Sequence, residues 1–260
     1  MSGDRARAFL TAEWRYLAML TFETEAALLR PFVPRGTELD THDGRALLSL
    51  VGFRFLRTRV LGCRVPFHQD FEEVNLRFYV RREVQGELRR GVTFIREIVP
   101  RHLITFVARS AYNEPYLTLR MHSDVPASPV AAPGRIRYAW RSSAGWQSLA
   151  LTALGAPRLP DHGTEHAFIS EHHWGYTRQR DGSYAGVSRR ARSVARVGRC
   201  RCGGAWGHDG VARHRVCPLA PSRAYFGIPG RGIVSHGDSA GAAEVGVGPC
   251  IPAGCRLTSA

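Results

Sequence analysis

The run 73–80 holds the side chains best suited to chemistry. Polar residues occupy every second position there, so a β-strand would place all of them on one face. A carboxylate close to an arginine in a poorly hydrated interior can have a shifted pKa and act as an acid or a base. The alternative, which the pattern leaves open, is the solvent-facing side of a half-buried strand. The four polar candidates are Glu73, Asn75, Arg77 and Tyr79.

Two further charged candidates lie in the next strand-like segment, "FIREIVP" (94–100). Arg96 and Glu97 are adjacent in sequence, so a strand would place them on opposite faces, and one of them could join the group on 73–80. The sequence does not fix the register of the two strands, so the choice stays open. Ordinary cross-strand pairing at the surface is the alternative for both residues.

The stretch "DHGTEHAFISEHHWGYT" (161–177) concentrates four histidines. His162 and His166 have the spacing of two metal ligands on one helix face, but a glycine follows His162 and no H-E-x-x-H order is present. We therefore predict no metal site. His172 and Tyr176 are better candidates for lining a cavity, and the alternative is an aromatic strand end with local hydrogen bonds.

Several chemistries are excluded by residues that the chain lacks. All basic residues other than histidine are arginine, so no lysine amine can form a Schiff base. The sequence also has no glycine-rich phosphate loop and no G-x-S-x-G elbow. We therefore predict no bound cofactor, and the pattern assigns no residue as catalytic.

Composition points to a cytoplasmic protein. The 260 residues suffice for one large domain with a real core. No apolar run approaches the ~18 residues that a membrane helix needs. The first residues also lack the apolar core of a secretory signal. We expect no membrane partner, and the sequence does not indicate an oligomeric state.

Up to residue 185 the chain has the pattern of many short-spaced strands, typical of an antiparallel barrel or sandwich. The clearest element is a hairpin over 72–100 with its turn at Gln85 and Gly86. A short helix is expected at 25–30, where Pro31 stops it. The other predicted strands are 13–22, 45–60 (one strand, or two with a bend at Gly52), 103–113, 116–121, 135–141 and 146–153, with a loop at 125–134.

Five stretches of this region resemble one known family. They are "FLTAEWRYLAML" (9–20), "SLVGFRFLRTRVLG" (49–62), "PFHQDFEEVNLRFYVRR" (66–82), "RRGVTFIREIVPR" (89–101) and "EHHWGYTRQRDGS" (171–183). Together, over about residues 9–185, they resemble the YqjF-like family of uncharacterised bacterial proteins, domain of unknown function 2071. The resemblance implies an acetoacetate decarboxylase-like fold, a mainly β, closed antiparallel barrel with few short helices and a central cavity. Acetoacetate decarboxylase works through a Schiff-base lysine, which this chain lacks.

The composition changes near residue 185. Residues 186–260 hold 11 arginines against three acids, five of the six cysteines and half of the 27 glycines. The segment "GVSRRARSVARVGRCRCGG" (186–204) could be an arginine arm for nucleic acid. A zinc site is disfavoured, because Cys200 and Cys202 are closer than the usual C-x₂₋₄-C pair.

We expect instead that residues 186–260 are out of frame and disordered. The resemblance implies a strand of the type "YRVEHPRWRVW" and an ending near "SAFLAEGS". In a reading frame moved by one base, the sequence from Gly186 can read "AYRVEHARWRVWAG", and 226–234 can read "SAFLAEGS". The predicted domains are therefore 1–185, a YqjF-like barrel that lacks its C-terminal strands, and 186–260, an Arg/Gly/Cys-rich tail.

Three functional hypotheses follow. The first is a protein that binds or transforms a small molecule in a central cavity without Schiff-base chemistry, with Glu73 or His172 as the acid or base. The second is a non-catalytic ligand carrier or interaction protein that uses the same cavity. The third and least favoured is nucleic-acid binding through the arginine-rich tail.

Overall fold

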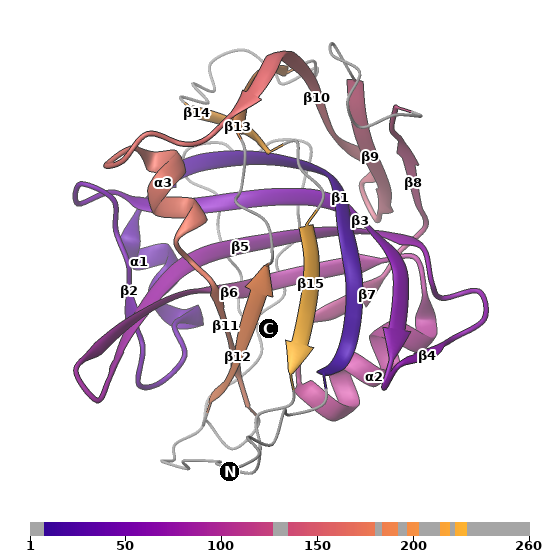
Figure 1. Cartoon of the computed structure of the whole chain (residues 1–260), viewed down its shortest axis with the longest axis horizontal. Helices are drawn as coiled ribbons and strands as arrows, with labels where there is room; N and C mark the ends of the chain where they lie inside the picture. Colours follow the sequence, from indigo (N-terminus) through magenta and orange to yellow (C-terminus); the bar gives the residue numbers. More distant parts are fainter. Residues whose placement is uncertain are drawn as a thin grey trace, which may run out of the picture.

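The computed structural model of this chain is mainly β-sheet with a few short helices (Figure 1). It describes residues 8–126, 135–179, 184–191, 197–202, 214–218 and 222–227. The strands are β1 (Ala8–Thr24), β2 (Glu38–Leu39), β3 (Ala46–Val60), β4 (Cys63–Arg64), β5 (Phe71–Val84), β6 (Glu87–Val99), β7 (Tyr116–Thr118), β8 (Met121–Asp124), β9 (Arg135–Ser142), β10 (Gly145–Arg158), β11 (Trp174–Arg178), β12 (Tyr184–Ala191), β13 (Val197–Cys202), β14 (His214–Pro218) and β15 (Ser222–Gly227). The helices are α1 (Ala26–Leu29), the 3₁₀ turn η1 (Arg30–Phe32), α2 (His102–Tyr112) and α3 (Glu165–Ser170).

The strands pair into one large mixed sheet. The long strands β1, β3, β5 and β6 are antiparallel neighbours in that order. β6 also pairs in parallel with β7 and with β11, because α2 and the longer segment that includes α3 carry the chain back to the same end of the sheet. The strand path ends at β4 and β8, although the pairing of β1 with β3 folds part of the sheet back on itself. The expected closed, wholly antiparallel barrel is therefore corrected to a curled mixed sheet among the described residues.

The C-terminal strands belong to the same sheet. β12 pairs with β11 and β15, and β13 pairs with β10. β14 and β15 both pair with β1. The prediction that the sheet lacks its C-terminal strands is not confirmed. The predicted disorder of 186–260 concerns residues that, for most of that length, lie outside the described ranges.

The predicted hairpin is confirmed. β5 and β6 pair from Val74↔Ile98 to Val84↔Glu87, with one register shift near Leu76. The turn residues Gln85 and Gly86 have φ angles of 52° and 77°, which is the left-handed backbone that a tight two-residue hairpin turn requires. The predicted helix near 25–30 and the strands at 13–22, 45–60, 135–141 and 146–153 are also present as α1, β1, β3, β9 and β10.

The predicted strand at 103–113 is wrong, because this segment forms the helix α2. Its β-branched residues favour a strand locally. The four-residue spacing of Ile104 and Ala108, however, brings both onto one core cluster in a helix. Asn113 then ends the helix in the left-handed conformation, with a φ of 52°. Packing against the sheet therefore overrides local propensity here.

The sheet is buried on both faces. The odd-numbered side of β5 packs into an aromatic core that includes Phe53, Phe71, Tyr79 and Phe168. The even-numbered side, Val74 to Val80, packs into a second core with β9 and β10. Strands covered on both faces usually read as nearly continuous apolar runs, whereas β5 alternates apolar and polar residues over 73–80. Between Phe71 and Val80, the side chains on both faces of β5 are therefore buried or partly buried.

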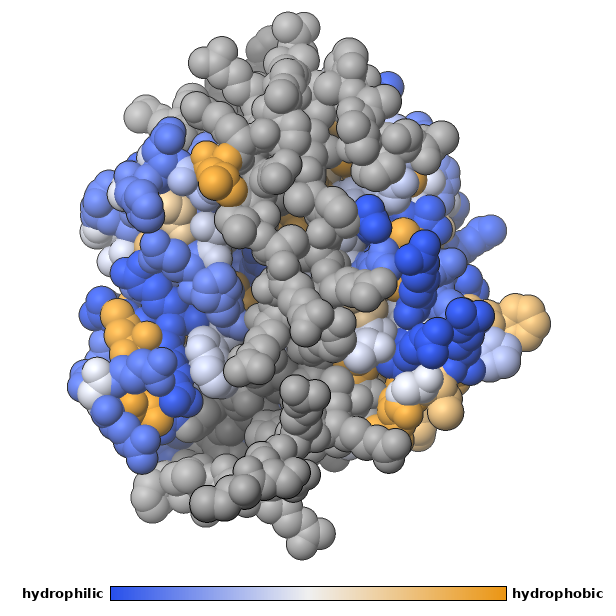
Figure 2. All heavy atoms as spheres, viewed as in Figure 1, coloured by the Kyte–Doolittle hydropathy of each residue, from blue (hydrophilic) through white to orange (hydrophobic). Residues whose placement is uncertain are grey.

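Hydrophilic residues dominate much of the face shown in Figure 2, and apolar residues gather where α2 and the turn at β4 lie in Figure 1. The exposed apolar side chains of these segments are Leu61, Phe67, Leu103, Phe106 and Val107. Among the described residues, no helix is both long and apolar enough to cross a membrane.

Candidate functional site

The four polar candidates of β5, here called the β5 row (Glu73, Asn75, Arg77 and Tyr79), lie on one face of that strand. Strand alternation places them there, and their partners across β3 are also odd-numbered, such as Ser49 opposite Arg77. Glu73, Asn75 and Tyr79 are at most 2% exposed, and Arg77 is partly buried. The alternative of a solvent-facing strand side is therefore wrong for this row.

Glu73 is held by two neighbouring side chains. One carboxylate oxygen accepts a hydrogen bond from the Tyr116 hydroxyl at 2.9 Å, and the other accepts one from the Asn75 amide at 3.1 Å. Glu97, only 1% exposed, stands directly across the ladder from Asn75. We call Glu73, Asn75, Glu97 and Tyr116 the carboxylate cluster. Two buried carboxylates near one phenol and one amide make a site where protons can be shared.

Tyr116 is a hydrogen-bond donor within the carboxylate cluster. Burial raises the pKa of its hydroxyl well above the usual range, and the charges of Glu73, Glu97 and Glu114 raise it further. The phenol therefore stays protonated and donates to Glu73. In the sequence, Tyr116 marks only the start of a predicted strand. The parallel pairing of β7 with β6, which sets Tyr116 beside Glu97, is not visible in the sequence.

Tyr79 begins a chain of hydroxyl groups. Its hydroxyl lies 2.6 Å from the Ser49 hydroxyl, which lies 2.9 Å from that of Thr21. Burial raises the pKa of Tyr79, while the Arg77 charge and hydrogen bonds from Ser49 and Arg77 partly oppose that rise. Thr21 and Ser49 are not among the candidates that the sequence predicts, because their positions on β1 and β3 matter only once the register is known.

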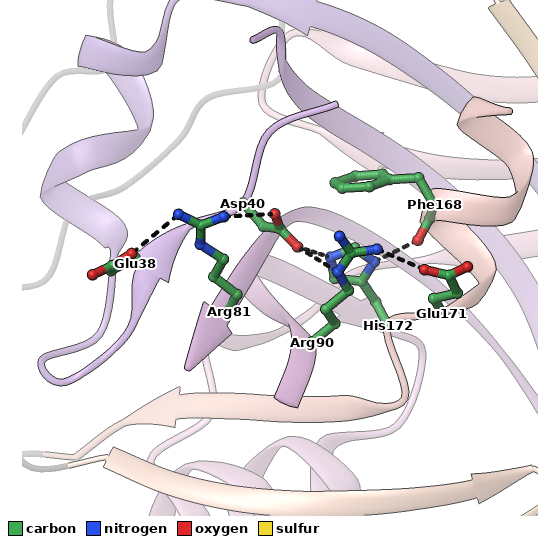
Figure 3. Close-up of polar contacts among 7 residues, drawn as sticks. All are labelled: Glu38, Asp40, Arg81, Arg90, Phe168, Glu171 and His172. Carbon is green, nitrogen blue, oxygen red and sulfur yellow. Dashed lines mark hydrogen bonds and ion pairs between the residues drawn. The ribbon is translucent and has the colours of Figure 1, made fainter. Parts of the chain in front are cut away.

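A second polar group surrounds His172, which follows α3 (Figure 3). The His172 Nε2 atom lies 3.0 Å from Asp40 Oδ2, and Nδ1 lies 2.6 Å from the carbonyl oxygen of Phe168. Arg90 Nε approaches Asp40 Oδ2 at 3.3 Å, and Arg81 lies 4.0 Å from the other oxygen. We call Asp40, Arg81, Arg90 and His172 the Asp40 cluster.

Asp40 is ionised despite its burial. Burial raises its pKa, but the hydrogen bond and charge of His172, with the charges of Arg90 and Arg81, together hold the pKa below its usual value. Both ring nitrogens of His172 therefore face hydrogen-bond acceptors, the Asp40 carboxylate and the Phe168 carbonyl oxygen.

The remaining candidates predicted from the sequence do not all lie on the face of the sheet that carries the β5 row. Arg96 stands opposite Leu76, on the other side of β6 from Glu97. The register thus resolves the open choice, and Glu97 is the residue beside the β5 row. Tyr176 belongs to the second core, where its ring packs against Gly91 so closely that a Cβ there would lie 2.6 Å from it. Tyr176 therefore packs apart from the carboxylate cluster.

Neither metal ligation nor the arginine-rich tail gains support from the geometry. His166 lies in α3, but His162 precedes it, so the two are not on one helix face. Within the described ranges, no group of three or more His, Cys, Asp or Glu side chains is arranged to hold a metal ion. The side chains of 186–260, on which the nucleic-acid hypothesis depends, lie outside the described residues.

Comparison with known proteins gives one family and several related folds. The family model described as DUF2071, an uncharacterized conserved protein, matches residues 11–195. The uncharacterized protein YqjF of Bacillus subtilis (strain 168) is 30% identical over 113 residues, which are 43% of this chain and 45% of that protein. The match thus spans less than half of the length of this curated relative.

Two solved enzymes have a similar fold. An acetoacetate decarboxylase-like enzyme from Sphingomonas wittichii RW1 has a TM-score of 0.53 and 14% identity, over 84% of this chain and 89% of that one. The enduracididine biosynthesis enzyme MppR, complexed with the condensation product of pyruvate and imidazole 4-carboxaldehyde, has a TM-score of 0.51 and 13% identity, over 84% of each chain. At such identities the likeness concerns the fold alone.

Proposed function

The chain belongs to the DUF2071 family of uncharacterized conserved proteins, and on that premise we propose that it binds a small molecule at the carboxylate cluster and transforms it by acid–base chemistry. The observation that carries this proposal is the buried Glu73 carboxylate, hydrogen-bonded by Tyr116 and Asn75, with Glu97 beside it. Buried carboxylates cost stability unless they are fully paired, and such groups gather at functional sites.

Each residue of the cluster has a distinct part in this proposal. Glu73 accepts a proton from the substrate, and the Tyr116 hydroxyl, whose one hydrogen is donated to Glu73 in the unliganded protein, then turns to donate it to the substrate oxygen on which charge develops. Asn75 holds the Glu73 carboxylate in place, as its 3.1 Å hydrogen bond indicates. Because the sequence has no lysine, this chemistry proceeds without a lysine Schiff base.

His172 is assigned a positioning part rather than that of the base. Both of its ring nitrogens already have hydrogen-bond partners, and its side chain is fully buried. Its ring packs edge-on against Tyr79, with the ring centroids 4.8 Å apart. Through this contact the Asp40 cluster fixes one end of the β5 row.

A Glu73→Gln substitution tests the proposal. Gln keeps the shape of the side chain but removes the charge and the basic oxygen. We expect the thermal unfolding midpoint of the unliganded protein to stay the same or rise, because an active-site charge is removed from the interior. We expect affinity for small neutral carbonyl compounds that also carry a hydroxyl donor, hydroxyacetone among them, to fall by about tenfold or more, since hydrogen bonds to charged groups contribute ~1.5–3 kcal/mol.

Thermal-shift and calorimetric titration measure both effects, and product formation is followed by NMR. The matched control is Glu72→Gln, because Glu72 is the preceding residue and points to the other face of β5. Binding lost equally in both variants, or retained in Glu73→Gln, would contradict the assignment. Binding that depends on Glu73 without any product would favour the non-catalytic carrier.

A further inference from the structure

A pocket of about 470 Å³ lies away from the carboxylate cluster, where three connections of the sheet meet. Its walls come from the start of α2, from the end of β7 and the turn after it, and from the end of β9. Its volume is within the usual range of small-molecule sites, about 300–1,000 Å³. The residues that matter are Pro100, His102, Leu119, Arg120, Arg141 and Ser143, and we call this site the arginine pocket.

Arg120 and Arg141 are held side by side in its wall. β8 and β9 pair with Met121 opposite Trp140, and one step further along this register Arg120 stands opposite Arg141. The backbone N–H of Arg141 donates to the carbonyl oxygen of Arg120 at 2.9 Å, which fixes this pairing. Side chains directly opposite on an antiparallel ladder have Cβ atoms about 4.5–5.5 Å apart.

Both arginines are exposed, so their mutual repulsion is screened by solvent but is not offset by a neighbouring anion among the described residues. Like charges directly opposite each other on a ladder destabilise the pair. None of the pocket-lining residues is acidic. Within the described ranges, neither guanidinium makes a hydrogen bond or ion pair with another residue. The other ladder neighbour of Arg141 is Trp146, which carries no charge. Two exposed arginines that line the pocket therefore have no anionic partner in the part of the chain that the structure describes.

We propose that the arginine pocket binds a small organic anion through a carboxylate or phosphate group placed between Arg120 and Arg141. A planar guanidinium matches either oxyanion with two parallel hydrogen bonds. The Ser143 hydroxyl supplies a further donor, and the apolar surfaces of Pro100 and Leu119 suit the carbon part of the ligand. The bound anion relieves the repulsion between the two arginines.

The experiment titrates the full chain with inorganic phosphate and, separately, with succinate, by calorimetry and by the ligand-induced rise in the unfolding midpoint. We compare the wild type with Arg120→Gln/Arg141→Gln. We expect at least one of the two anions to bind the wild type, with an affinity that falls as NaCl is added. The double variant should lose about tenfold or more in affinity and should unfold no earlier than the wild type without ligand.

Arg64→Gln is the matched control, because Arg64 is an exposed arginine on β4 outside this pocket. The affinity of the Arg64→Gln variant for the anion should equal that of the wild type. Stronger binding of phosphate than of succinate identifies a phosphate ligand, and the reverse identifies a carboxylate. The proposal is overturned if neither anion binds or if the double variant binds as tightly as the wild type. Glu73→Gln should leave this binding unchanged, which separates it from the proposed function.

Discussion

Asp40 and His172 show how burial fixes the charge of individual side chains. Asp40 is 1% exposed, yet the hydrogen bond from His172 and two nearby arginines keep it ionised. The unfolded chain offers none of these partners, so Asp40 binds a proton there near its ordinary pKa of 3.8. The pair thus stabilises the folded protein fully above about pH 4, and this stability is lost as the pH falls through the lower pKa of the folded state.

The substitution Asp40→Asn tests this coupling. At pH 7 we expect the free energy of unfolding to fall by ~3–5 kcal/mol, because His172 would remain buried without its anionic partner. As the pH falls below about 4, the variant should lose stability less steeply than the wild type. Urea denaturation over this pH range measures both effects. Asp43→Asn is the control, since Asp43 is 75% exposed and should change stability by less than about 0.5 kcal/mol. Equal acid slopes in wild type and Asp40→Asn would contradict the coupling.

Among the elements, β3 shows how one glycine sets the contact between two parts of the sheet. β3 runs unbroken from Ala46 to Val60, so the bend considered at Gly52 does not divide it. A Cβ at Gly52 would lie 2.5 Å from the ring of Tyr138 on β9. Tyr138 is fully buried there and donates its hydroxyl to the Tyr16 carbonyl oxygen at 2.6 Å. Gly52 therefore lets β9 pack directly onto β3.

A double-mutant cycle between Gly52 and Tyr138 tests this contact. Gly52→Ala alone should destabilise the protein by ~1–3 kcal/mol, because the new methyl group overpacks a filled core. In a Tyr138→Leu background the same substitution should cost much less, since the ring edge that it meets has been removed. Thermal and urea unfolding of all four proteins give the coupling. An equal cost of Gly52→Ala in both backgrounds would show that the ring contact does not limit this position.

The whole molecule depends on residues beyond 185. β14 and β15 pair with β1, and β13 covers the edge of β10. Without such partners these strands would present open edges, which promote aggregation. The strand β13 has the sequence "VGRCRC", in which Arg199 and Arg201 are two positions apart. We propose that the sequence of 186–260 is out of frame, and that the in-frame residues would pair more stably at these same edges.

A frame-restored chain, shifted by one base from the codon of Gly186 onward, tests this proposal. We expect its unfolding midpoint to exceed that of the chain as written by about 4–8 °C, the shift that ~2 kcal/mol produces in a protein of this size. Scanning calorimetry and light scattering measure stability and aggregation. The proposal fails if the chain as written unfolds as cooperatively and at least as late, or if verified bases at the codons of Tyr184 to Val187 exclude the shift.

Local pattern determined much of the fold and part of the site. Alternation alone placed Glu73, Asn75, Arg77 and Tyr79 on one face of a strand, because side chains in a strand alternate regardless of what surrounds them. The turn at Gln85 and Gly86 followed from its residue types. The family resemblance was also contained in the sequence, and the match over residues 11–195 agrees with it.

Tertiary structure decided which of those side chains meet. Only the register of β5 and β6 places Glu97 beside Asn75, and only the return of the chain through α2 brings Tyr116 to Glu73. The segment 103–113 is a helix because the sheet offers a surface for Ile104 and Ala108, which outweighs its β-branched residues. Contacts between residues far apart in the sequence depend on the packed chain, so no local pattern can encode them.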